Sequence, residues 1–433
     1  MHELIQFITE EIQDQYFATD NNIPWIVGFS GGKDSTMLLQ LVWYAIKDLP
    51  PELRTRKVYI VCNNTLVENP KILEFSERVL KQIQIAASEQ SMPVYVNRTT
   101  PKLEDTFWVN LIGKGYPSPN NLFRWCTERL KISPTTQFIL DKISEEGEAI
   151  ILLGTRRDES QARARSIKKH TVKGQRLSKH ILPKAFVYSP IKDILIDDLW
   201  QYLLQVPSPW GANNKELITL YKMSNNSGDC PLVIDTTTPS CGNSRFGCWV
   251  CTVVKRDRSM EGLIGSGEEW MEPLIDFRNL LAESRDREGW RENRRRNNDE
   301  GPGPYTPEIR ALLLKELLKT QLEVQKSQPE LSLINYQELV AIQVTWYRDS
   351  LFNNKVADIY NSIYGTRLSF DVDDDKSIKE KELLKDVCNA KSGDFDLIND
   401  LLTLQKTKTL LMNNRGLQND LENRLDQFIQ TGR

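Results

Sequence analysis

The stretch that decides the fold is Ile26-Val-Gly-Phe-Ser-Gly-Gly-Lys-Asp-Ser35. Its first four residues are apolar or small and predict the end of a buried strand. Ser30-Gly31-Gly32 predicts a tight turn, and the apolar run after Ser35 predicts a helix. A glycine turn between a strand and a helix N-terminus favours anions, because backbone N–H groups can approach a phosphate and the helix dipole adds positive charge. Lys33 adds a cation to this anion site.

The loop differs from a Walker A loop, which has four residues between its glycines and Ser or Thr after the Lys. Here three residues separate Gly28 from Gly32, and Asp34 follows Lys33. An aspartate among phosphates suits the orientation of Mg²⁺ or of the loop itself. Residues 30–35 resemble the PP-loop of ATP pyrophosphatases, a family that cleaves ATP between its α and β phosphates and adenylates a substrate oxygen. The alternative is an ordinary glycine-rich turn.

Strand and helix patterns alternate up to about residue 165. Strands are expected at 57–62, 94–96 and 149–153, and helices at 68–90 and 133–146, with Ser133 as N-cap of the last. This alternation predicts an α/β fold with a doubly wound, mainly parallel sheet. In such sheets ligands bind beyond the carboxyl ends of the strands, where residues 30–34, 63–64 and 154–157 are expected.

The rest of the chain predicts a loop-rich cysteine segment followed by a helical C-terminal module. We divide the chain into an ATP pyrophosphatase domain (1–225), a four-cysteine segment with a basic arm (226–300) and the helical module (301–433). Helices are expected at 307–325, 336–364, 376–389 and 395–430, with an acidic solvated loop at 371–375.

The composition excludes several classes of protein. The formal net charge is −3, so any contact with nucleic acid must come from a local patch. No apolar run reaches the roughly 18 residues of a transmembrane helix, and the N-terminus lacks a basic signal region. We therefore expect a cytoplasmic protein without membrane contact. Seven cysteines and only three histidines favour metal or redox chemistry over a disulfide framework or a histidine-based catalytic centre.

The second motif is Gly154-Thr-Arg-Arg-Asp-Glu-Ser-Gln-Ala-Arg163, which begins at the end of an expected strand. Arg156 and Arg157 can grip phosphates bidentately, and Glu159 could anchor one of these arginines. The alternative is a charged helix start with acids in its first turn. The pattern resembles the PP-loop subgroup related to phosphoadenosine phosphosulfate (PAPS) reductase.

The third motif is Phe123-Arg-Trp-Cys-Thr-Glu-Arg-Leu-Lys131. Its cations Arg124, Arg129 and Lys131 would lower the pKa of the Cys126 thiol, which suits a cysteine that carries sulfur as a persulfide. The alternative is a structural cysteine beside phosphate-binding residues. The stretch resembles an Arg-Trp-Cys-Thr motif of the same subgroup.

The fourth motif is a set of four cysteines, Cys230, Cys241, Cys248 and Cys251, with the spacing C-x10-C-x6-C-x2-C. Uneven spacing of four thiolates favours a [4Fe–4S] cluster. Zinc is less favoured, because zinc ribbons usually carry two C-x-x-C pairs. Cysteines without a ligand are the third possibility.

The fifth motif, Arg285 to Arg296, holds six arginines, three acids and one tryptophan. It could contact a nucleic-acid backbone, or it could be a solvated helix face with internal ion pairs.

Residues from about 24 to 320 resemble the DndC/SspD family of DNA phosphorothioation proteins. The resemblance rests on six features: the PP-loop, residues 65–70, the motifs at 123–131 and 154–160, the four-cysteine spacing, and Gly301-Pro-Gly-Pro-Tyr305. One departure is Asn63-Asn64, where such proteins often carry an aspartate.

The resemblance implies that ATP and Mg²⁺ bind at Ser30, Gly31, Gly32, Lys33, Asp34 and Ser35, with Gly154, Arg156 and Arg157 on the phosphates. Lys33, Asp34 and Cys126 would be catalytic, and the four cysteines would hold the cluster. The implied partners are DNA, a cysteine desulfurase and other phosphorothioation subunits. The implied reaction adenylates a DNA phosphate, after which sulfur displaces AMP. Alternatives are a PAPS reductase, a tRNA thiolase and a non-catalytic nucleotide-binding subunit of a defence complex.

Overall fold

The computed structural model describes residues 2–18, 23–170, 174–224, 247–297, 299–349, 351 and 355–367. It also describes short pieces at 383–385, 387–388, 394–395, 397–402, 405, 421, 425 and 429. The chain forms two compact units, and each combines two segments of the sequence. The first comprises residues 1–102 and 119–278, and the second residues 103–118 and 279–433.

The first unit is built on a six-stranded sheet with the strand order β3-β2-β1-β4-β6-β5. The strands are β1 (Trp25–Gly28), β2 (Val58–Asn63), β3 (Val94–Thr99), β4 (Ala149–Leu152), β5 (Leu177–Lys179) and β6 (Ala185–Tyr188). All neighbours pair in parallel except β5, which pairs antiparallel with β6 at the edge. The predicted α/β fold with a doubly wound, mainly parallel sheet is therefore confirmed.

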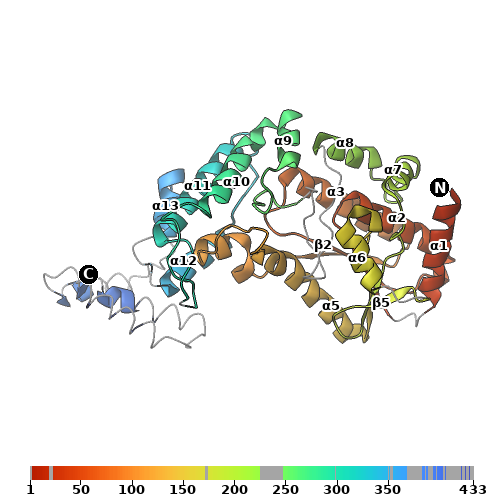
Figure 1. The fold of residues 1–433 in the computed structure, drawn as a ribbon, viewed down its shortest axis with the longest axis horizontal. Helices are drawn as coiled ribbons and strands as arrows, with labels where there is room; N and C mark the ends of the chain where they lie inside the picture. The colour runs from red at the N-terminus through yellow and green to blue at the C-terminus, as the bar shows by residue number, and fades with distance from the viewer. Residues whose placement is uncertain are drawn as a thin grey trace. The chain divides into compact units, whose positions relative to one another are not determined.

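Helices cover both faces of this sheet, and the alternation of side chains along β1 shows why. Trp25 and Val27 face a core formed with α1 (His2–Phe17), α2 (Lys33–Lys47) and α3 (Pro70–Glu89). Ile26 faces the opposite core, to which α5 (Ser133–Glu146) contributes Ile139. In Figure 1 α5 accordingly lies across the sheet from α2. Both faces of β1 are fully buried, as expected of a central parallel strand.

The remaining helices of the first unit lie in the connections of the sheet and in the segment that follows it. They are α4 (Trp125–Thr127), α6 (Gln161–His170), α7 (Ile196–Gln205), α8 (Asn214–Ser224), α9 (Arg258–Gly265) and most of α10 (Glu272–Ser284). Short helical turns are η1 (Pro51–Leu53), η4 (Glu128–Ile132), η5 (Arg157–Glu159) and η6 (Glu269–Met271).

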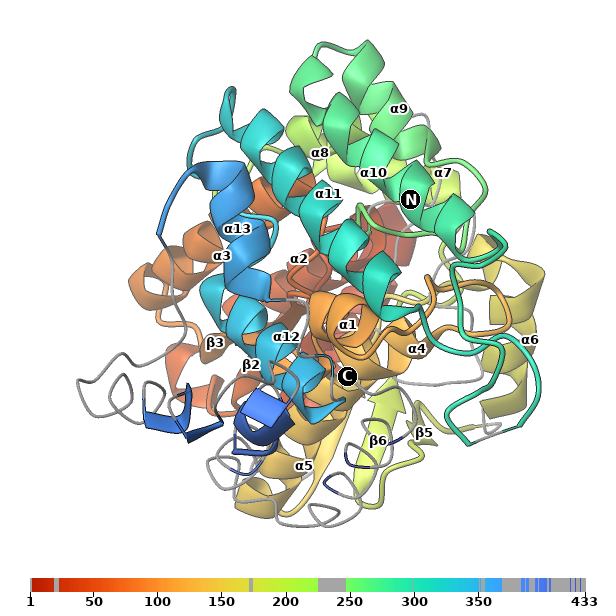
Figure 2. The same cartoon turned by 90° about the vertical axis from the view of Figure 1, so that its left-hand side faces the viewer.

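In the residues that the structure describes, the second unit is helical, as the apolar pattern of residues 307–364 predicts. Its elements are η2 (Leu103–Asp105), η3 (Val109–Gly113), α11 (Pro307–Gln325), α12 (Tyr336–Arg348) and α13 (Val356–Tyr364). Helix α13 packs against α11 and α12 (Figure 2). The inserted segment 103–118 belongs to this core, since the Trp108 indole donates to the Leu333 carbonyl at 2.6 Å and the Trp346 indole to the Ile112 carbonyl at 3.0 Å.

Two sequence predictions about helices are wrong. The single helix expected at 336–364 is two helices, because α12 ends at Arg348 and the Gln343 side chain accepts the first N–H of α13, at Val356, at 2.6 Å. Ser133 is no N-cap, because the chain is already helical through η4 when it reaches α5. The helices expected at 376–389 and 395–430 and the loop at 371–375 lie largely or wholly outside the described residues.

None of the described helices is both long and apolar enough to cross a membrane.

Candidate active site

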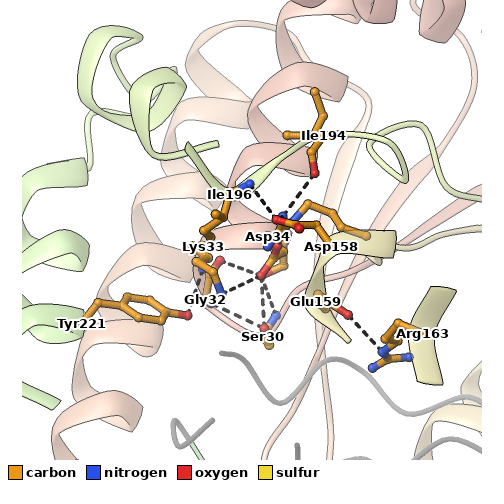
Figure 3. A network of polar contacts seen from close by, with 12 residues as sticks. Ser30, Gly32, Lys33, Asp34, Asp158, Glu159, Arg163, Ile194, Ile196 and Tyr221 are labelled. Carbon is orange, nitrogen blue, oxygen red and sulfur yellow. Dashed lines mark hydrogen bonds and ion pairs between the residues drawn. The ribbon is translucent and has the colours of Figure 1, made fainter. Parts of the chain in front are cut away.

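The loop between β1 and α2 is closed by its own serines (Figure 3). The Ser35 hydroxyl donates to the Gly32 carbonyl at 3.0 Å and accepts the Ser30 N–H at 3.2 Å. Gly31 has φ +77°, a conformation that side chains other than glycine rarely adopt. Ser30 and Ser35 therefore hold the backbone in a turn that only glycine tolerates at its second position.

The N-terminus of α2 is arranged to receive an anion. Its N-cap is Gly32, which has no side chain to cap the first turn, and the positive end of the helix dipole faces the loop. The Lys33 side chain is 1% exposed, and its ammonium lies 5.1 Å from the centre of the Tyr221 ring. The hydroxyl of Tyr221, which belongs to α8, accepts the Lys33 N–H at 3.3 Å. Tyr221 thus forms one wall of the loop.

Asp34 joins the loop to the second motif. One carboxylate oxygen lies 3.0 Å from the Lys33 ammonium, and the other accepts a hydrogen bond from the Arg156 guanidinium. Arg156 is 2% exposed and also donates to the Ile194 carbonyl at 3.2 Å. Gly154 makes this approach possible, because a Cβ there would lie 2.9 Å from the carbonyl atoms of Asp34. The two motifs are therefore one site, closed by a buried Lys–Asp–Arg network.

The residues after Arg156 make separate contacts. Arg157 is about half exposed and pairs with Asp193 at 2.7 Å, and Asp158 accepts the Ile196 N–H at 3.0 Å, at the start of α7. Glu159 pairs with Arg163 at 3.0 Å. The expectation that Glu159 anchors Arg156 or Arg157 is therefore wrong, because Asp34 and Asp193 take those two positions.

Glu159 is nevertheless part of the site's electrostatics. Burial and, to a smaller extent, the nearby Asp34 carboxylate raise the pKa of its carboxyl group to about 7, although Arg163, Arg156 and Lys33 oppose the shift. Two carboxyl groups therefore stand close together beside three cations at the end of β1 and β4.

The segment around Cys126 is a continuous helical stretch with one wide turn. It comprises α4, the π-helical turn η4 and α5, and Cys126 is half-buried within α4. The Asn63 side chain, at the carboxyl end of β2, donates to the Lys131 carbonyl at 3.3 Å and accepts from Thr135 at 3.0 Å. Asn63 therefore anchors the Cys126 stretch to the same edge of the sheet at which the loop lies.

Cys248 and Cys251 lie beside this stretch. The backbone of Cys248 forms an isolated antiparallel β-bridge with Glu68, just beyond β2. The Cys248 sulfur lies 3.3 Å from the Thr65 hydroxyl. The Cys251 N–H donates to the Cys248 carbonyl at 3.1 Å, so the C-x-x-C forms a tight turn. Burial raises the pKa of the Cys248 thiol, as do Glu68 and Cys126, whereas Lys131 and Thr65 oppose the rise. The Cys126 thiol thus lies within electrostatic range of Cys248.

Cys230 and Cys241 lie outside the described residues. Among the residues that the structure describes, no group of three Cys, His, Asp or Glu side chains is placed to hold a metal ion. Cys62 is buried at the end of β2, and burial raises the pKa of its thiol to about 12, which makes it a poor nucleophile.

A family model for the phosphoadenosine phosphosulfate reductase domain matches residues 24–254, more than half of the 433 residues. The chain belongs to this family. The match begins at β1 and ends just after Cys251. It therefore covers the loop at residues 30–35, the motif that contains Arg156, the motif that contains Cys126, and the C-x-x-C turn. No curated protein matches the chain.

Two solved structures are similar in part to this chain. A phosphoadenylyl-sulfate reductase from Candida auris, solved with phosphate, is 13% identical and covers 51% of this chain and 86% of its own, with a TM-score of 0.31. The U34-tRNA thiolase NcsA from Methanococcus maripaludis, with its [4Fe-4S] cluster, is 12% identical and covers 66% of this chain and 79% of its own, also with a TM-score of 0.31.

The basic motif at 285–296 lies in the second unit and does not form the helix face that one interpretation required. Arg291 donates to the Gly303 and Pro302 carbonyls at 2.7 Å each. Arg285 pairs with Asp286 at 3.0 Å, and Arg296 lies 3.8 Å from Asp349. The Arg287 guanidinium lies 4.5 Å from the centre of the Trp290 ring, so several of the motif's arginines make contacts inside the unit.

Three parts of the site were missed in the sequence: Tyr221, Asp193 and the Ile194 carbonyl. Tyr221 lies 188 positions from Lys33 in the sequence, and no motif surrounds it. By contrast, Thr65 lies in the stretch 65–70, and Arg163 ends the second motif, four residues after Glu159, the spacing of an ion pair on a helix.

Proposed function

We propose that the protein is an ATP pyrophosphatase that adenylates a DNA backbone phosphate and supports replacement of a non-bridging oxygen by sulfur. One observation carries this proposal: the anion-binding loop and the Cys126–Cys248 region lie at the carboxyl ends of neighbouring strands, β1 and β2. An activated phosphate and a sulfur-carrying thiol need this proximity.

The loop accounts for the first step. The α2 N-terminus and Lys33 bind the triphosphate, and a non-bridging DNA oxygen attacks the α-phosphorus of ATP. The bond to the bridging oxygen breaks, pyrophosphate leaves, and the DNA phosphate becomes a mixed anhydride with AMP. Positive charge at the loop stabilises the transition state and the leaving pyrophosphate. Arg156 holds Asp34, and Asp34 in turn positions the Lys33 ammonium.

Mg²⁺ fits this site through one protein carboxylate. Asp34 already pairs with two cations, so it would offer Mg²⁺ a single shared oxygen, and the phosphates of ATP would supply others, a common arrangement for this ion.

The second step replaces AMP by sulfur. The terminal sulfur of a Cys126 persulfide, loaded by a cysteine desulfurase, attacks the DNA phosphorus, and AMP leaves with the former DNA oxygen. The S–S bond is then cleaved by a second thiol, which forms a disulfide with Cys126 and leaves sulfur on phosphorus. Arg129 and Lys131 lie three and five residues from Cys126. Lys131 lowers the pKa of the Cys248 thiol and Cys126 raises it, so both lie near that thiol.

The four cysteines would hold a [4Fe–4S] cluster; a zinc ion is the less favoured alternative. Cys248 and Cys251 fit this role, since a tight turn places both thiols in one short segment, which the Arg278 guanidinium supports by donating to the Cys251 carbonyl at 2.9 Å. Such a cluster supplies one-electron chemistry when bound. Binding would also deprotonate the buried Cys248 thiol, whose raised pKa otherwise keeps it protonated.

A sulfonucleotide reductase is the second candidate, favoured by the family match over residues 24–254. It would cleave a sulfur–oxygen bond of a nucleotide-bound sulfate by thiol chemistry and would use no ATP. A tRNA thiolase would use ATP with RNA as its acceptor.

The test measures pyrophosphate release by the purified protein with ATP, Mg²⁺ and a cysteine desulfurase, and with DNA, tRNA or no acceptor. A parallel assay measures sulfite release from PAPS. We expect pyrophosphate release that depends on DNA. Lys33→Ala should abolish this release, whereas Lys47→Ala, at the exposed end of the same helix, should retain it. Sulfite release from PAPS without ATP would overturn the proposal, and so would pyrophosphate release that only tRNA stimulates.

A further inference from the structure

Helix α6 is a basic helix that begins directly after the second motif. It runs from Gln161 to His170, contains no buried residue and holds no acidic residue. Its cationic side chains are Arg163, Arg165, Lys168 and Lys169, with His170 at its end. Figure 1 shows α6 within the sheet-containing unit. This concentration of charge contrasts with the whole chain, whose acidic residues outnumber its basic ones.

The charges of α6 fall on two faces. Arg163 and Ile167, four residues apart, share the face toward the site, where Arg163 pairs with Glu159 at 3.0 Å (Figure 3). Arg165, Lys168 and Lys169 have the spacing i, i+3, i+4 and share the other face. All three are exposed. In the described part of the chain, none of these three pairs with a carboxylate.

The exposed face carries an energetic cost in isolation. Like charges three and four residues apart destabilise a helix, and a ten-residue helix without buried contacts is marginal in water. Cations in the last turn interact favourably with the helix dipole, which accounts for Lys168 and Lys169. The dipole does not account for Arg165, in the first half of the helix, or for the lack of any carboxylate. A bound polyanion would remove the repulsion.

We propose that Arg165, Lys168 and Lys169 bind backbone phosphates of DNA. This inference rests on the proposed function. A single nucleotide has its own site at the α2 N-terminus, so it leaves these three cations unused. Arg165 and Lys169 are separated by about 6 Å along the helix, which matches the span of about two phosphates of a strand.

The experiment measures the affinity of the full chain for a fluorescein-labelled DNA duplex and its single strand by anisotropy, over a range of NaCl concentrations. Three lost phosphate contacts should reduce the magnitude of the slope of log K against log [salt] by about 2.7 for the duplex and about 2.1 for the single strand, and should lower the affinity at 0.1 M salt at least about 100-fold. The variant is Arg165→Gln/Lys168→Gln/Lys169→Gln, and its thermal unfolding shows whether it is folded.

Two matched variants serve as controls. Lys47→Gln/Lys81→Gln/Lys215→Gln removes the same charge from exposed positions elsewhere in the unit and should keep the wild-type slope. Arg165→Lys/Lys168→Arg/Lys169→Arg retains the charge and should also keep the wild-type slope.

The outcomes separate this inference from the proposed function. A wild-type slope in the Gln variant of α6 would overturn the inference and leave DNA sulfuration standing. Equal loss in both charge-removal triples would also overturn it, since total charge would then explain binding. If the wild-type chain binds no DNA, or binds only RNA through these residues, both proposals fall.

Discussion

At the scale of single residues, the site depends on Asp34. Its carboxylate contacts both the Lys33 ammonium and the Arg156 guanidinium, and all three side chains are almost fully buried. Burying charges is unfavourable unless they are paired, so loss of one partner costs far more than loss of an exposed ion pair.

Arg156→Met should therefore lower the free energy of unfolding by about 3 kcal/mol, because it leaves Asp34 with one buried partner. Arg157→Met is the matched control: its guanidinium is 46% exposed and pairs with the exposed Asp193, so the change should stay within about 1 kcal/mol. Urea unfolding without nucleotide measures both. Equal losses in the two variants would contradict the network described here.

Glu159 should make stability depend on pH. Its pKa is raised from 4.5 to about 7 in the folded state, so the folded state binds more protons than the unfolded state between these values. Stability contributed by Glu159 is therefore lost as pH rises from about 4.5 to about 7.

Glu159→Gln removes this dependence. The variant should gain stability relative to wild type as pH rises through that window, measured by thermal unfolding without nucleotide or metal. A constant difference between the two proteins at all pH values would show that Glu159 ionises normally.

The residues that line the loop were predictable from sequence only where one motif contains both partners. Ser30 and Ser35 lie in one motif and contact each other. Arg156 was expected on phosphates, but its Asp34 partner lies 122 positions away, and sequence spacing carries no information about such a contact. Tyr221 was missed for the same reason.

At the scale of elements, the loop is fitted closely against α3. A Cβ on Gly31 would lie 2.5 Å from the Ser76 hydroxyl, and the positive φ would be strained whatever the space. Two costs therefore act at one position, and they can be separated.

Gly31→Ala should weaken ATP binding, and Ser76→Ala in the same chain should restore part of it by removing the hydroxyl. The φ strain remains, at a cost of about 1 kcal/mol or more, so recovery should be incomplete. Isothermal titration with ATP measures it, and Ser76→Ala alone is the control. Full recovery would show that the backbone is unstrained.

The order of strands and helices was predictable because periodicity is a local property. Alternating strands and helices give the parallel sheet, and Gly-containing strand ends mark its ligand edge. The break between α12 and α13 was not predictable, since the apolar pattern continues and the Gln343 cap depends on a tertiary position. The helical turn η4 before Ser133 was missed because its wide turn has no sequence signature.

At the scale of the whole molecule, each unit is assembled from two segments of chain. Segment 103–118 gives the second unit its buried Trp108, Leu111 and Ile112. Arg310, which is 5% exposed, donates to the Ile112 carbonyl at 3.1 Å and pairs with Asp349 at 2.9 Å.

A fragment of residues 279–433 should therefore fail to unfold cooperatively, because loss of one large buried side chain alone costs about 3–5 kcal/mol. The same fragment joined to residues 103–118 by a flexible Gly/Ser linker should regain a sharp transition, followed by circular dichroism. A sharp transition in the shorter fragment would show that the insertion is dispensable.

The central claim is that this chain places sulfur on DNA through the loop at residues 30–35. Mass spectrometry of nuclease-digested DNA from the native host tests it most directly, with the intact strain compared against one carrying Ser30→Ala and Asp34→Ala. We expect sulfur-containing dinucleotides in the intact strain and none in the variant. Their absence from both strains, while the protein is produced, would contradict the claim.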